Sequence, residues 1–419
     1  MNNLLRLASN SLLNRKATVL LSIFTIGISV LLLLGVEQVR TQAKNSFANT
    51  ISSTDLIVGA RSGQINLLLY SVFRIGNATN NIDWKTYQDF KDHKAVRWTV
   101  PFSLGDSHQG FRVLGTNQDY FKYYKFGKKQ PLTFKEGQPF NQLFEAVIGA
   151  DVAQTLGYQL QSPMVLAHGM KDVGFSKHDN APFKVVGILA PTGTPVDKTI
   201  HVSLEAIEAI HVGWESGAFL GHAPSADNLA ARAFEPEQIT AFLMGLKSKI
   251  HTFKVQRQIN EYRLEPLSAI VPGIALHELW SLMSVAEQAL LVVSIFVVVA
   301  GFLGMLASLL TSLNERRREM AILRALGAKP RHIFSLLVLE TGIICGLGIL
   351  LGMALLYLIL ALASPIIQQQ YGLAISISPP SQYELILIGC IQLSGIIIGI
   401  IPAISAYRQS LSDGMTIRI

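Results

Sequence analysis

Residues 314–332 read NERRREMAILRALGAKPRH, and they separate two apolar runs that are each long enough to cross a bilayer. Six of these residues are Lys or Arg and two are Glu, so the positive-inside rule predicts that the segment is cytoplasmic. Its pattern also predicts a short amphipathic helix, with Met320, Ile322, Leu323 and Leu326 forming one apolar stripe. A solvated basic loop that only sets the topology is the alternative interpretation.

Two residues limit this helix at its carboxyl end. Gly327 suits a helix C-cap, and Pro330 prevents simple continuation into the next helix. We therefore expect a short helix held against the inner face of a membrane, with apolar side chains and charges available to a cytoplasmic partner.

The composition indicates a mixed architecture. Half of the 419 residues are hydrophobic, the mean hydropathy is +0.37 and 15% of the residues are charged. This is too apolar for an ordinary soluble protein and too charged for a chain that lies wholly in lipid. The net charge of +7 reflects three presumed cytoplasmic pieces (1–16, 314–332 and 408–419), which hold 11 basic and 3 acidic residues. The basicity therefore indicates membrane topology and excludes a nucleic-acid-binding surface.

Four apolar segments are long enough to span a membrane, and no Lys or Arg occurs between Ile333 and Tyr407. The first span follows Arg15 and Lys16 and has no small-x-small cleavage site, so we expect an uncleaved signal anchor. Both chain ends are predicted to be cytoplasmic. The predicted order is an interfacial helix (1–16), span one (17–38), a large extracytoplasmic domain (39–283), span two (284–313), the basic segment (314–332), span three (333–363), a short loop (364–384), span four (385–407) and a tail (408–419).

Four carboxylates fall within the membrane zone. Glu37, Glu287 and Glu384 are near the outer ends of spans, where we expect them to reach water. Glu340 lies about two turns into span three, where a carboxylate costs several kcal/mol unless it is paired. We expect it to turn back toward the Arg-rich segment; a proton or ion path is the alternative. No span carries a line of polar groups, so a substrate-conducting pore is not evident.

The spans are rich in small residues at a spacing of three or four. Such pairs let helices approach closely, either within one subunit or across a dimer seam, and both interpretations stay open. The pairs are Gly301/Gly304, Gly342/Gly346, Gly348/Gly352 and Gly395/Gly399.

Residues 39–283 predict an α+β domain, because strand-like and helix-like runs alternate along it. We also expect a looser insertion at about residues 214–227. The expected strands are Val96–Val100, Gly110–Val113, Glu145–Ile148, Phe183–Leu189, Ile200–Val202 and Thr252–Gln256. The expected helices are Asp151–Leu156, Leu204–Ile210 and Glu235–Lys249.

Catalytic motifs do not occur in this domain. The sequence holds no G-x-S-x-G, no H-E-x-x-H, no paired cysteine ligands and no phosphate-binding glycine loop, so we predict a non-catalytic chain that binds no cofactor itself. His178, His201, His211 and His222 are weak metal-ligand candidates, since their spacing matches no known ligand pattern. Surface or hydrogen-bonded histidines are the favoured interpretation.

The stretch Glu315–Ala328, with Glu340 downstream, resembles the signature of the FtsX-like ABC permeases, a group that includes MacB, LolC and LolE. The four-span topology also resembles that family, and Val147–Ala150, Phe183–Gly187 and Asp197–Leu204 resemble the MacB-type periplasmic core domain. A second resemblance, carried by residues 54–63 and 70–82, is to a branch encoded in zinc-responsive proteobacterial gene clusters.

The resemblance implies an inner-membrane permease with a periplasmic domain, which dimerises and is served by two ABC ATPase subunits that bind ATP and Mg²⁺. Because MacB carries a fused ATPase and this sequence shows none, we expect the ATPase on a separate chain. The segment 314–332 would be the coupling helix that docks on it, and the spans would transmit ATP-driven motion to the periplasm. A second copy of the permease, a periplasmic accessory protein and membrane lipid are the other implied partners. The implied coupling residues are Glu315, Arg316, Arg317, Arg318, Glu319, Met320, Ile322, Leu323, Arg324, Ala325, Leu326 and Gly327.

A transmembrane signal transducer, which controls a periplasmic partner without moving cargo, is the alternative function within this family. A secondary transporter is disfavoured because charge within the spans is sparse. Neither the cargo nor the direction of movement follows from the sequence.

Overall fold

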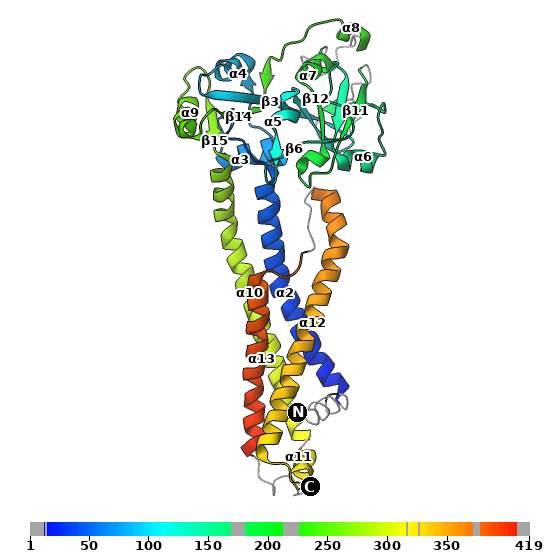
Figure 1. Ribbon diagram of the computed structural model, residues 1–419, viewed down its shortest axis with the longest axis vertical. Coiled ribbons are helices and arrows are strands. Elements are labelled where there is room, and N and C mark those ends of the chain that lie inside the picture. Colours follow the sequence, from blue (N-terminus) through cyan, green and yellow to red (C-terminus); the bar gives the residue numbers. More distant parts are fainter. Residues whose placement is uncertain are drawn as a thin grey trace. The chain divides into compact units, whose positions relative to one another are not determined.

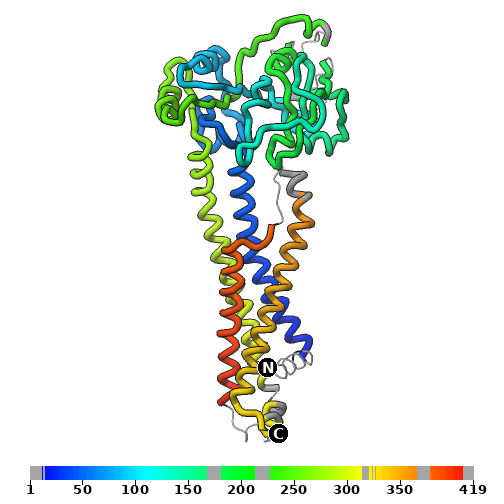
Figure 2. The backbone as a smooth tube through the Cα atoms, viewed as in Figure 1, coloured from blue at the N-terminus to red at the C-terminus, as the bar shows by residue number. Residues whose placement is uncertain are grey.

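The computed structural model describes residues 12, 15–168, 181–212, 226–315, 317–325, 327–371 and 378–408 (Figure 2). The chain divides into two compact units. The membrane unit comprises Met1–Gln42, Ser284–Pro365 and Ser376–Ile419, and the large domain comprises Ala43–Met283 with Ile366–Ile375. This division confirms the expected fold class, in which one large domain is inserted between the first two spans.

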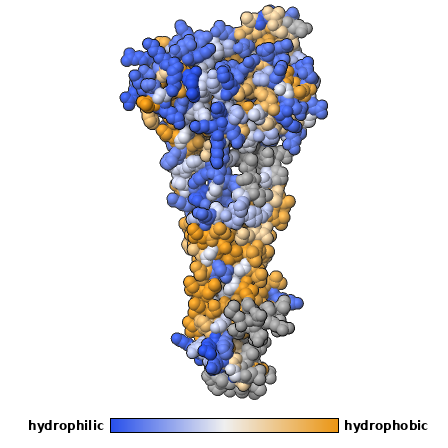
Figure 3. Space-filling view, viewed as in Figure 1, coloured by the Kyte–Doolittle hydropathy of each residue, from blue (hydrophilic) through white to orange (hydrophobic). Residues whose placement is uncertain are grey.

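Four helices of the described chain are long and apolar enough to cross a membrane. They are α2 (Lys16–Thr50), α10 (Pro272–Glu315), α12 (Pro330–Tyr371) and α13 (Gln382–Arg408) (Figure 1). Apolar side chains cover their spanning stretches (Figure 3). Each helix is longer than its apolar run. In particular, α12 continues to Tyr371, so residues 364–371 are helical where a loop was expected, although they include Pro365.

Glycines bring these helices close together within one chain. A Cβ atom added to Gly348 of α12 would lie 2.7 Å from Cγ2 of Ile26 in α2. A Cβ atom added to Gly399 of α13 would lie 2.7 Å from Cβ of Thr341 in α12. Packing within the subunit is therefore confirmed for these glycines, and they need no dimer seam to explain them.

The carboxylates near the outer ends of the spans have partners. Glu37 and Glu384 are buried, which corrects the expectation that these two reach water, whereas Glu287 is half-buried. Glu37 Oε1 lies 2.8 Å from Arg40 Nη2, and Glu287 Oε2 lies 3.8 Å from Arg40 Nη1. Glu384 is 5% exposed and forms a capping box with Ser381 at the start of α13: each backbone N–H donates to the other side chain, at 2.6 and 3.2 Å. The buried Glu384 carboxylate is stabilised because it accepts a hydrogen bond from the backbone N–H of Ser381, which precedes the helix.

An eleven-stranded sheet forms the centre of the large domain. Its strands are β1 (Leu56–Ala60), β3 (Val96–His108), β4 (Phe111–Thr116), β7 (Phe134–Gly137), β8 (Glu145–Ile148), β9 (Pro163–Met164), β10 (Ala167–His168), β11 (Phe183–Leu189), β12 (Thr199–Ser203), β14 (Ala241–Leu246) and β15 (Leu267–Ile270). The order is β15-β1-β14-β3-β4-β12-β8-β11-β7, with β10 beside β3 and β9 beside β11. Two small sheets pair β2 (Ile82–Asp83) with β13 (Gln238–Ile239) and β5 (Lys125–Phe126) with β6 (Gln130–Pro131).

Short helices join and cover these strands. They are α3 (Gln64–Leu68), the π-helix η1 (Leu69–Phe73), α4 (Trp84–Lys91), α5 (Asp119–Tyr123), α6 (Ala150–Leu156), the 3₁₀ helix η2 (Pro195–Lys198), α7 (Leu204–His211), α8 (Ala226–Ala230), the 3₁₀ helix η3 (Lys249–His251) and α9 (Thr252–Asn260). The tip of the expected insertion, residues 213–225, lies outside the described residues.

Strand β3 connects the two halves of the sheet, because it pairs with β14 on one side and with β4 on the other. One buried cluster, the β14 core, includes Val58 and Phe242 and is covered by α4 and α9. Another, the β12 core, includes Ile148 and Ile200 and is covered by α6 and α7. A third and larger cluster, which includes Ile57, Phe102 and Val147, runs across both halves of the sheet, so the large domain is one compact unit.

Two of the expected elements are wrong: an expected helix forms strands, and an expected strand forms a helix. Residues 238–246 form strands rather than the helix expected over Glu235–Lys249, because β14 is buried on both faces at the centre of the sheet. Residues 252–260 form α9 rather than a strand, since Val255 and Ile259, four residues apart, are buried on one helical face. The expected strands at 145–148 and 183–189 and the helices at 151–156 and 204–210 are confirmed within one residue at each end.

Candidate functional site

The basic segment contains the helix α11 (Arg317–Ala325), as its amphipathic pattern predicts. Gly327 follows the helix with a φ of +99°, a conformation that favours glycine because it lacks a Cβ atom. Pro330 is the first residue of α12, where its missing N–H leaves no hydrogen bond unmade. The helix α11 therefore ends just before Gly327, and the next helix begins at Pro330, as the sequence indicated.

The apolar residues of α11 lie on two faces rather than on one stripe, which corrects the expectation. Met320 and Ala321 are 7% and 6% exposed, whereas Ile322 is 52% exposed and Ala325 is exposed. Residues two positions apart on an α-helix are rotated by roughly 200° about the helix axis, so Met320 and Ile322 point to opposite sides.

The buried face of α11 holds it to the spanning helices. Met320 lies in a buried cluster with residues of three spanning helices. These residues are Leu313 of α10, Ile333 and Leu337 of α12, and Ala403 and Ala406 of α13. Met320 of α11 therefore packs against residues of all three helices.

Several predicted coupling residues cannot be placed. Arg316 and Leu326 lie outside the described residues, and the side chains of Glu315, Arg317, Arg318, Glu319 and Leu323 are not described. Of the predicted set, the described outward face consists of Ile322 and Ala325, with Arg324 half-buried and Gly327 exposed beside them.

Glu340 of α12 is completely buried, and it pairs with a residue that the sequence did not indicate. Its Oε2 atom lies 3.2 Å from Nη2 of Arg15, just before the start of α2. The side chain of a helical residue points toward the helix amino terminus, which directs Glu340 toward the side of the membrane unit where Arg15 lies. A paired carboxylate of this kind is a structural contact between two spans.

His201 of β12 is part of the core. It is completely buried, its ring centroid lies 5.0 Å from that of Tyr120, and Nδ1 lies 3.3 Å from the carbonyl oxygen of Val147. Burial, helped by the positive charge of Arg74, lowers the pKa of His201 to about 3. The ring is therefore neutral at physiological pH and packs as an aromatic group.

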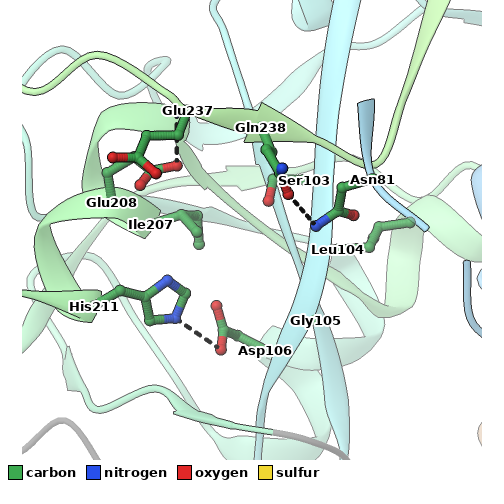
Figure 4. A pocket seen from close by; sticks show the side chains of 10 residues that line it. All are labelled: Asn81, Ser103, Leu104, Gly105, Asp106, Ile207, Glu208, His211, Glu237 and Gln238. Carbon is green, nitrogen blue, oxygen red and sulfur yellow. Dashed lines mark hydrogen bonds and ion pairs between the residues drawn. The ribbon is translucent and has the colours of Figure 1, made fainter. Parts of the chain in front are cut away.

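His211 lies at the end of α7, where it faces a carboxylate on another element. Its Nε2 atom is 3.7 Å from Oδ1 of Asp106 in β3 (Figure 4). Burial lowers the pKa of His211, but the opposing hydrogen bond and charge of Asp106 and the charge of Glu208 outweigh burial, so the pKa is raised. The other two candidate histidines, His178 and His222, lie outside the described residues.

A cleft of about 370 Å³ opens beside His211, on the surface of the large domain. One wall is α7, with Ile207, Glu208 and His211; the floor is residues 103–106 of β3; the other wall is Asn81 with Glu237 and Gln238 (Figure 4). The carboxylate of Glu208 accepts a hydrogen bond from the backbone N–H of Glu237 at 3.4 Å, and burial raises its pKa. Sequence reasoning missed Asp106, Glu208 and Glu237, because they come from three segments with no common motif.

Metal coordination has little support in the described part of the chain, where no three His, Cys, Asp or Glu side chains converge on one point. His201 is enclosed by aromatic rings, and His211 is occupied by Asp106.

Two family models match this chain. The FtsX-like permease C-terminal model matches residues 291–411, and the MacB-like periplasmic core domain model matches residues 19–261. Together these matches cover the spanning helices, the basic segment and most of the large domain.

Two ATP-binding/permease proteins are among the relatives that this chain matches. The macrolide export ATP-binding/permease protein MacB 1 of Yersinia pestis bv. Antiqua (strain Antiqua) is 24% identical over 330 residues, which are 77% of this chain and 46% of that protein. The pyoverdine export ATP-binding/permease protein PvdT of Pseudomonas syringae pv. tomato is 25% identical over 281 residues, 65% of this chain and 39% of that protein. The chain thus spans less than half the length of these relatives.

A solved structure, the periplasmic region of MacB from Actinobacillus actinomycetemcomitans, aligns with 55% of this chain and 94% of its own. Its TM-score is 0.34 and its identity 8%, a distance at which the alignment adds nothing to the family matches.

Proposed function

This chain belongs to the FtsX/MacB-like ABC permeases, and we propose that it is the permease subunit of an exporter that couples ATP hydrolysis to conformational work in the periplasm. The ATPase is a partner chain that binds ATP and Mg²⁺, and two copies of it serve two copies of the permease. The complex lies in the bacterial inner membrane, with both ends of the chain in the cytoplasm and the large domain in the periplasm. The excess of Lys and Arg in residues 314–332 supports this orientation.

The division of α11 into two faces is the observation that carries the proposal. Met320 packs against α10, α12 and α13 and Ala321 is buried next to it in the sequence, while Ile322 and Ala325 remain exposed for a partner. A buried face gives the helix a firm attachment, and an exposed apolar side chain gives an ATPase a place to hold it. A helix that only marked topology would need neither.

Long helices offer a route for the motion. The helices α2 and α10 run for 35 and 44 residues without interruption, and each contributes residues to both compact units. An unbroken helix keeps its hydrogen bonds when it is displaced as a rigid body, so movement at its cytoplasmic end reaches the residues at its other end. The cargo then needs no path through the spans, in agreement with the paired state of Glu340.

Copurification tests the docking surface. The double variant Ile322→Asp/Ala325→Asp should lose the ATPase from a detergent-solubilised complex, since two carboxylates replace the apolar contact. Ile250→Asp is the matched control, because Ile250 is 88% exposed in the large domain, far along the chain from α11. The control should retain the ATPase as wild type does. A double variant that still copurifies the ATPase at wild-type stoichiometry would overturn the proposal.

A second measurement separates an exporter from a signal transducer of the same family. The ATPase rate of the complex in nanodiscs should rise when the transported compound is added, because cargo and ATP hydrolysis are coupled in an exporter. A rate that responds only to a purified periplasmic partner protein would favour the transducer.

A further inference from the structure

A second cavity lies at one edge of the central sheet, where two parallel strands end. Strands β4 and β12 are parallel, and their last residues, Thr116 and Ser203, pair with each other. Because β8 runs antiparallel to β12, its first residue, Glu145, lies at the same edge. The cavity has a volume of about 320 Å³, and the residues that line it either end or follow β4 and β12 or precede β8. It therefore brings together three segments that are far apart in the sequence.

The helices that follow these two parallel strands lie on opposite faces of the sheet. Val113 and Leu114 are neighbours on β4, yet Val113 lies in the β12 core and Leu114 in the larger cluster with Phe102. Because successive side chains of a strand point to opposite faces, the two clusters cover the two faces of the sheet. The helix α7, after β12, packs in the β12 core through Ile207, whereas α5, after β4, packs in the larger cluster through Phe121. Ligands bind at such points in α/β sheets, because the chain leaves the two strands in opposite directions and opens a crevice at their carboxyl ends.

We propose that this cavity binds a small neutral sugar. Four of its eight described lining residues carry a carboxamide: Asn117, Gln118, Asn141 and Gln142. A carboxamide both donates and accepts hydrogen bonds, and so does each hydroxyl group of a sugar. The only charged residue among the eight is Glu205, whose exposed carboxylate lies in the first turn of α7, where the positive end of the helix dipole offsets it. A neutral ligand is therefore favoured over an ion.

One of these carboxamides is not satisfied by the chain. The Oδ1 atom of Asn117 is buried and accepts no hydrogen bond within the described residues. A buried carbonyl oxygen without a donor is uncommon in folded proteins, so it indicates a donor that the chain itself does not supply. Rotation about the Cβ–Cγ bond of asparagine is soft, so this oxygen can turn toward a ligand in the cavity that Asn117 lines.

Hydrogen bonds within the chain fix the walls of the cavity. Oε2 of Glu145 accepts hydrogen bonds from the backbone N–H groups of Asn141 and Gln142, at 2.7 and 2.9 Å. Nε2 of Gln118 donates to the carbonyl oxygen of Phe140 at 2.8 Å. The Phe140 side chain is 3% exposed and belongs to the larger buried cluster, so it offers an apolar contact to the C–H groups of a sugar ring. A wall that is already ordered lowers the entropic cost of binding.

Saturation-transfer difference NMR of the full chain in nanodiscs tests the inference, because the method detects weak binding of small molecules. Nanodiscs are used because many detergents carry sugar headgroups that would compete for the cavity. The probes are D-glucose, D-galactose and maltose, with cyclohexanol as a counterpart that keeps a six-membered ring but has a single hydroxyl group. We expect saturable binding of at least one of these sugars and no saturable binding of cyclohexanol. The inference concerns the large domain alone and holds whether or not α11 docks an ATPase.

Asn117→Leu distinguishes a ligand contact from a structural one. Leucine has a similar shape but no amide, so sugar binding should weaken about fivefold, the effect of losing one hydrogen bond. The unfolding midpoint should stay the same or rise, because the variant removes a buried oxygen that has no partner in the described chain. Gln142→Ala, at an exposed position, should weaken sugar binding about threefold. Gln130→Ala is its matched control, since Gln130 is an exposed carboxamide on β6 outside this cavity, and it should bind sugar as wild type does.

Several results would overturn the proposal. One is the absence of saturable binding for all three sugars, and another is equal binding of cyclohexanol. Wild-type affinity in Asn117→Leu, or equal weakening in Gln142→Ala and Gln130→Ala, would place sugar binding elsewhere on the chain. Saturable binding of triglycine in place of the sugars would assign the carboxamides to a peptide backbone instead.

Discussion

The Nη2 atom of Arg15 lies 3.2 Å from the Oε2 atom of Glu340, so an ion pair joins the start of the first spanning helix to the third, across 325 positions of the chain. The carboxylate is completely buried and the guanidinium is 15% exposed. Because a buried ion pair is costly to separate, this pair holds the start of α2 against α12.

Glu340→Ala should destabilise the membrane unit by about 3 kcal/mol, because it leaves the Arg15 guanidinium without its carboxylate. Arg15→Met should destabilise the membrane unit by a similar amount, because it takes the guanidinium away from the Glu340 carboxylate. The double variant Arg15→Met/Glu340→Met should be more stable than either single variant, since no uncompensated charge remains. Thermal unfolding in detergent measures all three, and additive losses in the double variant would contradict the pairing.

Two glycines of α13 should respond in opposite directions to alanine. Gly389→Ala should stabilise the protein by up to about 1 kcal/mol, because nothing lies within 4 Å of the added Cβ and alanine favours the helix. Gly399→Ala should destabilise it by about 1–3 kcal/mol, since the new methyl group would overlap Thr341 of α12. The same thermal unfolding assay compares them, and equal shifts of the unfolding midpoint would refute the close approach.

Acid should destabilise the large domain through His201. The pKa of this residue is about 3 in the folded chain, against about 6.5 in an unfolded one. Between those values the unfolded chain binds a proton that the folded chain does not, so stability falls as the pH falls, by about 1.4 kcal/mol per pH unit.

The variant His201→Leu should show a shallower dependence of unfolding free energy on pH between 6.5 and 4, measured by urea titration with tryptophan fluorescence. Val202→Leu, on the same strand, changes packing without removing a titratable group and should keep the wild-type slope. Parallel slopes for His201→Leu and wild type would show that His201 does not contribute.

Aspartate substitutions on the buried and exposed faces of α11 should have different effects on stability. Met320→Asp should lower the unfolding midpoint of the isolated permease, because it places a carboxylate among the buried residues of α10, α12 and α13. Ile322→Asp should leave that midpoint unchanged, since its side chain is 52% exposed. Size-exclusion chromatography and thermal unfolding measure the two variants side by side, and equal loss of stability would contradict the assignment of faces.

Sequence patterns predicted the spanning helices because a bilayer imposes a length and a composition that hydropathy records directly. The same reasoning failed at residues 238–246. There Ile239, Phe242, Leu243 and Leu246 recur at helical spacing, yet they form strands, because β14 is buried on both faces and shows no polar alternation.

The candidate sites show a similar limit. The bounds of α11 followed from Gly327 and Pro330, which act locally. The partner of Glu340 and the cleft beside His211 did not follow from the sequence, because each depends on residues brought together from distant segments. Local patterns record backbone preference, whereas pairing across the fold is decided by packing.

Strand β1 hydrogen-bonds to β14 on one side and to β15 on the other, although β1 ends at Ala60 and its partners begin at Ala241 and Leu267. During synthesis at about 5–20 residues per second, β1 must wait for roughly 10–40 seconds before both partners exist. Over that interval its backbone donors and acceptors are open to incorrect pairing. The nascent protein therefore has a period of vulnerability set by the order of its strands, and a chaperone that shields the β1 segment would raise the yield of folded protein more than one that acts after synthesis ends.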